Sequence, residues 1–380
     1  MEDDDSAMSY IYENPKWPEL TWDSRFLSKL CSDVRHKQGK LLGRMESLGF
    51  DFKNQAFLTA LTEEVVMTSS IEGENLNKDH VRSSIAKRLG IKIGGLKEGV
   101  SREVDGVVEL TLDATRNFEA PLDEERLFSW HRCLFPKGKL VPYGIRVGQW
   151  RTDEDGPMQV VSGAMGKEAV HYEAPAAQRI PAEMAKFLAW YNEQKDVEAL
   201  VRAAASHFWF VTIHPFDDGN GRIGRAIAEM ELSRSDQSSD RFYSMSSQIF
   251  SERRDYYRQL ESSQKSGLDI TLWIEWFLGC LGRSIDTSEI NMDSILEKAR
   301  IWENIHKFAV NERQKKVINT LLDEFQGNLT SSKYSCMATC SKETAIRDIQ
   351  DMMTKKILVK NDSGGRSTNY RLLTSKEFSS

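Results

Sequence analysis

The chain has 380 residues, of which 40% are hydrophobic and 28% are charged, and its formal net charge is -6. This composition is that of a globular protein with two or three domains, and nine Trp and seventeen Phe exclude an intrinsically disordered chain. No apolar run approaches the roughly 20 residues that span a bilayer, and the acidic start MEDDDSAMSY lacks the pattern of a secretory signal. The five cysteines are scattered and show no zinc-site spacing, which fits a reducing cytoplasm. Together with the missing apolar run, this leads us to expect a cytoplasmic protein without membrane association.

Apolar residues recur three and four positions apart through most of the first 285 residues, which predicts a mainly α-helical body. The predicted helices cover residues 24–48, 54–69, 101–117, 123–134, 181–194, 196–213, 222–234, 252–263 and 269–285. One β-hairpin is expected near residues 158–174, because MQVVSG and AVHYEAP flank the glycine-containing loop GAMGKE. The early stretch NPKWPELTWD is expected to pack as an ordered strap, since Trp buries a large apolar area.

The pattern changes from about residue 311. RQKKVINTLLDEFQ predicts an amphipathic helix, and TSSKYSCMA and SKETAIRDIQDMMTKK predict two more, each opened by a Ser/Thr cap. ILVKNDSGGRSTNYRLL predicts two strands joined by a Gly-Gly turn. This order is that of a winged helix-turn-helix domain, a fold that binds proteins as well as DNA. Residues 311–373 hold 11 basic and 7 acidic side chains, so this segment is basic while the remainder is acidic.

The stretch IHPFDDGNGRIGR, residues 213–225, places charge and glycine between two apolar helical runs. Pro215 ends the first helix, because it has no amide hydrogen. Gly219 and Gly221 let a ligand approach the backbone, where successive amides at the start of the next helix form an anion site. Arg222 and Arg225 share one helix face, and two guanidiniums beside such amides suit a polyphosphate.

The remaining polar residues of this stretch fit the same chemistry. Carboxylates beside phosphates indicate a divalent cation between them, and magnesium takes one or two carboxylates together with phosphate oxygens. His214, just before the turn, can act as a base at neutral pH. A base, a cation ligand, an amide nest and two arginines are the components of phosphoryl or nucleotidyl transfer. His207, on the preceding helix, is interpreted as a packing residue.

Residues 214–225 match every defined position of H-P-F-x-[D/E]-G-N-G-R-x-x-R, the core motif of the Fic-domain family, and the chain resembles that family over roughly residues 55–285. YIYENPKWPELTWD and the C-terminal winged helix resemble parts of one bacterial subgroup. The resemblance implies a Fic-type helical bundle with a small β-hairpin flap, followed by a winged helix-turn-helix domain. It predicts an N-terminal helical extension (1–100), a Fic catalytic core (101–290) and the winged helix-turn-helix domain (291–380).

The resemblance implies a protein adenylyltransferase, which moves AMP from ATP to a Ser, Thr or Tyr hydroxyl of a target protein or of itself and releases pyrophosphate. His214 would deprotonate the hydroxyl, and Asp218 would hold Mg²⁺ or Mn²⁺ at the α- and β-phosphates. Family members that transfer phosphate carry Lys at the position of Gly221, so its absence favours AMP transfer. Phosphocholine transfer stays open.

The same resemblance assigns the groups that hold the nucleotide. The amides of Gly219, Asn220 and Gly221, together with the Asn220 side chain, would cradle the phosphates. Arg222 would stabilise charge on the transferring phosphate, and Arg225 would hold the γ-phosphate.

Two further segments are similar to parts of the family's site. The hairpin at 158–174 lies where the family has a flap that binds the target segment by strand addition, with Val160 and Val161 as candidates to clamp the target side chain. DYYRQLESSQ resembles the helix on the adenine side, and its candidate residues are Tyr256, Tyr257 and Gln264.

The stretch MTSSIEGENL, residues 67–76, contains the family's inhibitory pattern [S/T]-x-x-x-E-[G/N] as Thr68 to Gly73. The resemblance implies that Glu72 pairs with Arg225 and so occupies the arginine that the γ-phosphate needs. The chain is therefore expected to be autoinhibited. A bifunctional enzyme, in which Glu72 also positions water to remove AMP, stays open.

A second reading belongs to another class: a DNA-binding regulator whose Fic core senses nucleotide without transferring it. The basic C-terminal segment supports this reading, with Arg347 and Arg366 as the contacts to try, while the intact His214 argues against it. The winged helix could instead contact a protein substrate. The family resemblance also suggests a homodimer.

Overall fold

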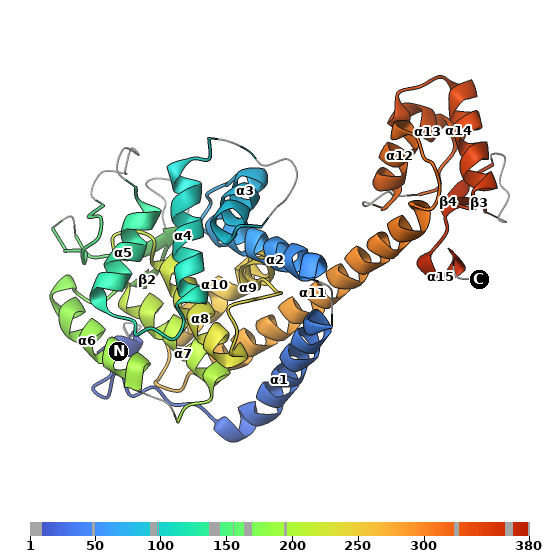
Figure 1. Cartoon of the computed structure of the whole chain (residues 1–380). Helices are drawn as coiled ribbons and strands as arrows, with labels where there is room; N and C mark the ends of the chain where they lie inside the picture. The colour runs from blue at the N-terminus through green and yellow to red at the C-terminus, as the bar shows by residue number, and fades with distance from the viewer. Residues whose placement is uncertain are drawn as a thin grey trace, which may run out of the picture. The chain divides into compact units, whose positions relative to one another are not determined.

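A computed structural model describes residues 10–47, 50–91, 97, 99–136, 145–154, 156–162, 169–193, 196–322, 327–361 and 368–378. The chain forms two compact units, Met1–Ser288 and Glu289–Ser380 (Figure 1). The three-part division expected from the sequence stays a prediction. Within the described part of the chain, no helix combines the length and the apolarity needed to cross a lipid bilayer.

The first unit is mainly α-helical, as predicted from the spacing of apolar residues (Figure 1). Its helices are α1 (Ser24–Glu46), α2 (Phe50–Ile71), α3 (Lys78–Leu89), α4 (Arg102–Arg116), α5 (Glu124–Leu134), α6 (Ile180–Glu193), α7 (Ala199–Ile213), α8 (Asn220–Asp236), α9 (Met245–Ser251) and α10 (Arg253–Gln264), with the short 3-10 helices η1 (Ile11–Glu13) and η2 (Ala177–Arg179). The long helix α11 (Thr271–Ile305) begins in the first unit and ends in the second.

Helices α7 and α8 form the centre of the first unit, and α2, α4 and α5 pack against α8 (Figure 1). The N-terminus of α7 is capped by Glu198, whose carboxylate accepts hydrogen bonds from the amides of residues 200 and 201. Every residue from Leu200 to Ile213 except Arg202 is buried, so α7 is enclosed by the rest of the first unit on nearly all sides. The Trp273 indole on α11 donates to the Ala204 carbonyl at 2.8 Å and fastens α11 to this centre.

Three features of the helical pattern differ from the sequence-based prediction. Helices α3 and α9 were not predicted, because α3 buries only a narrow apolar face and α9 has only seven residues. Helix α11 was expected to end at 285 but continues to Ile305. Its last turns are rich in charged residues, yet Ile301 and Ile305 lie in the core of the second unit. Packing within that unit, and not the local spacing of apolar residues, therefore extends the helix.

The predicted hairpin is formed by the antiparallel strands β1 (Gln159–Ser162) and β2 (Ala169–Glu173). Tyr172 of β2 is buried, and its hydroxyl donates to the Thr212 carbonyl of α7 at 2.6 Å. The N-terminal strap is also ordered as expected: Trp17 is buried and its indole donates to Glu183 at 2.8 Å. Both segments are therefore fastened to the helical centre.

The second unit contains α12 (Glu312–Leu322), α13 (Ser331–Ala338), α14 (Lys342–Thr354), the antiparallel strands β3 (Leu358–Lys360) and β4 (Tyr370–Leu372), and α15 (Ser375–Phe378). The predicted caps are present, because Thr330 accepts from the Lys333 amide and Ser341 from the Thr344 amide. Three helices followed by a hairpin is the order predicted for a winged helix-turn-helix, and that assignment stays a prediction. Arg347 is exposed on α14, whereas Arg366 lies outside the described residues.

Gly106 provides a test of how α4 packs on α5. A Cβ atom at this position would lie 1.9 Å from the Cys133 carbonyl oxygen, so Gly106→Ala must push the two helices apart. We expect a loss of about 1–3 kcal/mol in unfolding free energy, measured by urea unfolding with tryptophan fluorescence.

The matched control is Gly39→Ala in the exposed face of α1, where an added Cβ meets nothing within 4 Å. Ala favours the helix by about 1 kcal/mol over Gly, so the control is expected to gain stability. Equal unfolding midpoints for the Gly106 variant and the native chain would contradict the packing derived for α4.

Candidate functional site

The loop between α7 and α8 carries the predicted motif and begins with His214, which ends α7 in the left-handed conformation (φ 52°, ψ 58°). The ring atom Nδ1 lies 3.2 Å from the Val211 carbonyl oxygen. Because a carbonyl only accepts hydrogen bonds, Nδ1 carries the proton of the neutral ring and Nε2 keeps its lone pair. Burial lowers the pKa of His214 to about 4, so at neutral pH Nε2 is able to accept a proton.

Arg151 holds the backbone around His214, and sequence reasoning missed it. Its Nε donates to the His214 carbonyl at 2.8 Å, and its backbone amide donates to the Pro215 carbonyl at 3.0 Å. The guanidinium is fully buried, pairs with Asp153 at 2.9 Å and donates to the Pro175 carbonyl at 2.5 Å, just beyond β2. A single Arg in a polar stretch gives no sequence signal for such a role. Its contacts explain how the strained conformation of His214 persists.

The interior of the loop is closed by Phe216 and Asn220. Phe216 is completely buried, and its backbone amide donates to Asn220 Oδ1 at 2.9 Å while its carbonyl accepts from Asn220 Nδ2 at 2.7 Å. The sequence interpretation gave the Asn220 side chain a part in cradling phosphates. The structure instead places both ends of that amide on the Phe216 backbone, where they fix the turn.

The first turn of α8 offers free backbone amides. Gly219 precedes the helix with φ 84°, a conformation that favours glycine. Ile223 donates the first intrahelical hydrogen bond, to the Gly219 carbonyl at 3.0 Å, so the amides of Asn220, Gly221 and Arg222 have no acceptor within the helix. The sequence interpretation named the amides of Gly219, Asn220 and Gly221 as an anion site; in the structure the amides without an intrahelical acceptor at the positive end of α8 are those of residues 220–222, and the anion site stays a prediction.

His131 of α5 lies beneath this loop and was not singled out from the sequence. Its buried ring stacks on Phe216 with centroids 4.3 Å apart. Nδ1 is 3.0 Å from the amide nitrogen of Gly148, and Nε2 is 3.1 Å from the carbonyl oxygen of Asp218. A His that follows Trp130 on an amphipathic helix reads as a core residue, so only the structure connects it to the loop.

The two aspartates of the loop have different surroundings. Asp217 accepts a hydrogen bond from the Arg146 amide at 2.8 Å, which makes it part of the loop's support. The Asp218 side chain is 50% exposed; its Oδ1 accepts from the Gly219 amide at 2.5 Å and lies 3.7 Å from Arg222 Nη2. No cluster of three or more metal-ligating side chains occurs among the described residues. A cation at Asp218 would therefore take most ligands from phosphate and water, which suits magnesium.

Arg225 forms the ion pair that the sequence predicts. Its Nη2 lies 2.8 Å from Glu72 Oε1, and the side chain of Arg225 is only 3% exposed. Nε and Nη2 also donate to the hydroxyl and carbonyl of Thr68, each at 2.8 Å. Nη1 is buried and has no hydrogen-bond partner among the described residues. The guanidinium is thus held by α2 on one side and retains one unsatisfied donor.

The end of α2 brings a second carboxylate to the site. Gly73 adopts φ 85°, and the amides of Gly73 and Glu74 bond back to the carbonyls of residues 70 and 69, which is a Schellman termination of the helix. Glu72 then lies over Gly221, where an added Cβ would be 2.1 Å from its Oε1. Glu74 Oε2 lies 2.7 Å from Arg222 Nη1. Sequence reasoning missed Glu74. The available signal was its position directly after Gly73 and two residues after Glu72, at the end of the same helix.

The predicted adenine-side residues have separate partners. Tyr256 is buried, and its hydroxyl lies 2.9 Å from His207 Nε2, so His207 is a packing residue as interpreted. Gln264 is buried and donates to the Thr212 hydroxyl at 3.3 Å. Tyr257 is 36% exposed and donates to the Ile71 carbonyl, next to Glu72. Among the three, Tyr257 is the one that is not buried.

The flap candidates lie on the hairpin that Tyr172 fastens to α7. Val160 is paired with Tyr172, and Val161 with Val170, with a register shift between them. Val161 and Val170 are 48% and 45% exposed, so two apolar side chains of the hairpin face solvent. Val160 is half-buried.

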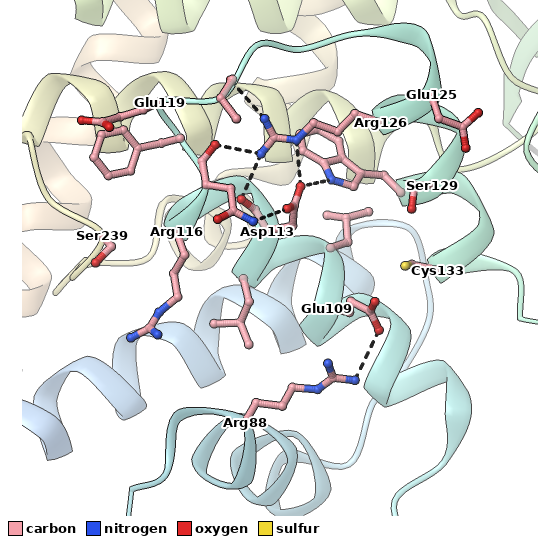
Figure 2. A pocket seen from close by; sticks show the side chains of 16 residues that line it. Arg88, Glu109, Asp113, Arg116, Glu119, Glu125, Arg126, Ser129, Cys133 and Ser239 are labelled. Atoms are coloured by element: carbon pink, nitrogen blue, oxygen red, sulfur yellow. Dashed lines mark hydrogen bonds and ion pairs between the residues drawn. The ribbon is translucent and has the colours of Figure 1, made fainter.

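A wide depression of about 1100 Å³ lies away from this loop, among α3, α4 and α5 (Figure 2). Figure 2 shows Arg126 beside Asp113, whose carboxylate accepts from Nε at 2.8 Å. The remaining donors of Arg126 bond carbonyls of residues 113, 117, 120 and 121. The Trp130 indole also donates to Asp113. The charged groups of this depression bond to one another and connect the C-terminus of α4 to α5, which is a structural role. We therefore place the functional site at the α7–α8 loop.

Comparison with known proteins agrees with this placement. Residues 121–232 match the Fic/DOC family, and residues 10–91 match a domain of unknown function, DUF4172. The chain is 26% identical over 212 residues to protein adenylyltransferase fic-1 of Caenorhabditis briggsae, covering 52% of this chain and 38% of that protein. It is 28% identical over 129 residues to the uridine 5'-monophosphate transferase of Xanthomonas campestris, covering 30% of this chain and 22% of that protein.

The fold is similar to that of a Fic family protein from Desulfovibrio desulfuricans, with a TM-score of 0.52 and 22% identity over 90% of this chain and 96% of the other. The α7–α8 loop, with His214 and the first turn of α8, lies inside the family match. This chain therefore contains a Fic/DOC family domain built around that loop.

Proposed function

We propose that the chain is a protein adenylyltransferase that transfers AMP from ATP to a hydroxyl of a target protein and that Glu72 holds it inactive. The observation that carries the proposal is the position of His214, whose Nε2 keeps its lone pair and has no bonding partner among the described residues, beside three amides without an intrahelical acceptor and two buried arginines. The relatives named above transfer AMP or UMP, which supports transfer of a nucleotide. Experiment must decide whether the transferred nucleotide carries adenine or uracil.

In this reaction Nε2 of His214 takes the proton of the target hydroxyl as its oxygen attacks the α-phosphorus. The bond from the α-phosphorus to the bridging oxygen breaks, and pyrophosphate leaves with the electron pair. The amides of residues 220–222 and the Arg222 guanidinium bind phosphate oxygens on which charge develops. Asp218 would hold magnesium, which neutralises phosphate charge when bound.

The brake follows from charge and space. Glu72 occupies the side of Arg225 that faces the loop, and its carboxylate lies over Gly221, where the phosphates would be. A negative group at that position repels phosphate and fills its volume. The unsatisfied Nη1 of Arg225 gives a further reason to place an anion here, because a buried donor without an acceptor costs free energy.

The target segment would bind along the hairpin. Exposed Val161 and Val170 provide apolar contact at its surface, and an added strand would need only main-chain hydrogen bonds. Because such recognition uses main-chain groups, it accepts many sequences, and contacts outside the hairpin must select the target protein.

Glu72→Gly is expected to increase transfer of label from α-labelled ATP to protein by about tenfold or more, because a hydrogen bond to a charged group contributes about 1.5–3 kcal/mol. Glu72→Gly/His214→Ala is expected to lose the label, since the base is removed. Label is measured on protein after magnesium and ATP are added to the full-length chain.

The matched control is Glu63→Gln, because Glu63 lies on the same helix and pairs with the exposed Lys78 rather than with the site. We expect this control to match the native chain. Equal labelling of the native chain and the Glu72 variant would refute the brake. ATP binding without labelling in any variant would favour a nucleotide sensor, and a salt-dependent duplex-binding curve would then test the DNA-binding reading.

Glu74→Gln, added to Glu72→Gly, is expected to raise transfer a further two- to fivefold. It frees Arg222, but the Glu74 side chain is 34% exposed, and pairs with an exposed partner contribute about 0.2–1 kcal/mol. The gain should appear mainly in kcat, because Arg222 contacts the phosphate that is transferred. A decrease in kcat would show instead that Glu74 orients Arg222 for the reaction.

The pH profile tests the base. Burial lowers the pKa of His214 to about 4, and the charge of Glu72 opposes that shift, so the ring is unprotonated through pH 6.5 in the Glu72→Gly chain. We expect kcat/KM for the target to stay level as the pH falls through 6.5 and to decrease only toward a pH of about 4. A decrease centred at pH 6.5 or above would exclude His214, with this pKa, as the base. Tryptophan fluorescence at each pH verifies that the chain remains folded.

A further inference from the structure

Helix α5 supports the phosphate loop from below. A Cβ on Gly219 would lie 3.0 Å from Leu134 and 3.3 Å from Phe135, so the loop backbone rests directly on these side chains. The Phe135 ring also lies beneath Arg222, with the guanidinium 5.5 Å from its centroid. His131, one turn earlier, stacks on Phe216 and is completely buried. The end of α5 and its C-cap thus contact the loop and the start of α8 at three positions, 131, 134 and 135.

The hydrogen bonds of His131 define its tautomer. The Gly148 amide can only donate, so Nδ1 of His131 accepts that bond and carries no proton. Nε2 must then carry the proton of the neutral ring, and it donates to the Asp218 carbonyl at 3.1 Å. Both ring nitrogens are used, and the loop receives its hydrogen bond from the Nε2 side alone.

That bond sets the orientation of one peptide group. The Asp218 carbonyl and the Gly219 amide belong to the same planar trans peptide and point in opposite directions. Because His131 holds the carbonyl toward the interior, the Gly219 N–H is directed away from α5, toward the exposed carboxylate of Asp218, which accepts it at 2.5 Å. If Asp218 held a cation, its carboxylate would be engaged there and the Gly219 amide would be left to donate to phosphate.

We propose that His131 is a positioning residue of the phosphate loop, which turns the 218–219 peptide so that the Gly219 amide faces the nucleotide. The inference deepens the proposed nucleotide transfer and rests on it for the identity of the anion. His131 contacts neither substrate nor the reacting atoms; it acts through the loop backbone.

Two amide side chains separate the two hydrogen bonds. The amide group of Asn reaches about as far as Nδ1 of His, so His131→Asn can keep the bond from the Gly148 amide and loses the one to Asp218. The amide of Gln reaches about as far as Nε2, so His131→Gln can keep the bond to the Asp218 carbonyl. His131→Phe keeps the stacking on Phe216 and loses both bonds.

The variants are made in the 380-residue chain that carries Glu72→Gly. They are compared by calorimetric binding of magnesium–ATP, by the kinetics of transfer from α-labelled ATP and by thermal unfolding. We expect His131→Asn and His131→Phe to weaken ATP binding and to raise KM for ATP by about tenfold or more, because a donor to a charged phosphate is misdirected. His131→Gln is expected to remain within about threefold of its parent, a difference well below the worth of one such hydrogen bond.

Equal losses in the Asn and Gln variants, or ATP affinities that follow thermal stability and not the bond retained, would overturn the proposal. Unchanged ATP affinity in all three variants would also overturn it. The binding measurement separates this inference from the proposed function: if the parent binds ATP but transfers no label, the proposed function fails while the comparison of Asn with Gln still decides the role of His131.

Discussion

The carbonyl groups of the loop from His214 to Asp218 point into the protein, and buried donors hold four of them. Arg151 binds the carbonyls of residues 214 and 215, Asn220 binds that of Phe216, and His131 binds that of Asp218. A peptide whose carbonyl faces inward directs its amide outward. In the 218–219 peptide this directs the Gly219 N–H away from α5, whereas Pro215 has no N–H and the Phe216 amide is itself bonded to Asn220. Donors from other parts of the fold thus hold the loop backbone from behind.

The energetically unfavourable features of this site lie in the core of the protein. His214 stands in the left-handed region, and Arg151 is a buried cation whose charge is balanced by Asp153. Each feature would be unfavourable alone. Together they give a rigid loop with an unprotonated imidazole at one end and free amides at the other, which is the preorganisation that phosphate chemistry requires.

The outward side of the loop meets the end of α2, where a Schellman turn places two carboxylates two residues apart. Glu72 and Glu74 pair with Arg225 and Arg222, so each arginine of the motif has an acidic partner from one turn. In the function proposed above, regulation and catalysis would depend on the same two guanidiniums. A small movement at Gly73 would change both ion pairs at once, because both carboxylates follow from one helix termination.

The sequence by itself determined the helical body, the hairpin and the His214 motif, because each follows from local spacing or a contiguous motif, whereas the pairing of Glu72 with Arg225 was implied only by the family resemblance. Only the tertiary structure shows the contacts of His131, Arg151 and Glu74 with the loop and the arginines, and the hydrogen bonds between the Asn220 side chain and the Phe216 backbone. It also extended α11 to Ile305. The physical reason is common to these cases: an inward backbone group or an apolar face is satisfied by whichever residue the fold brings near, and sequence distance carries no record of it.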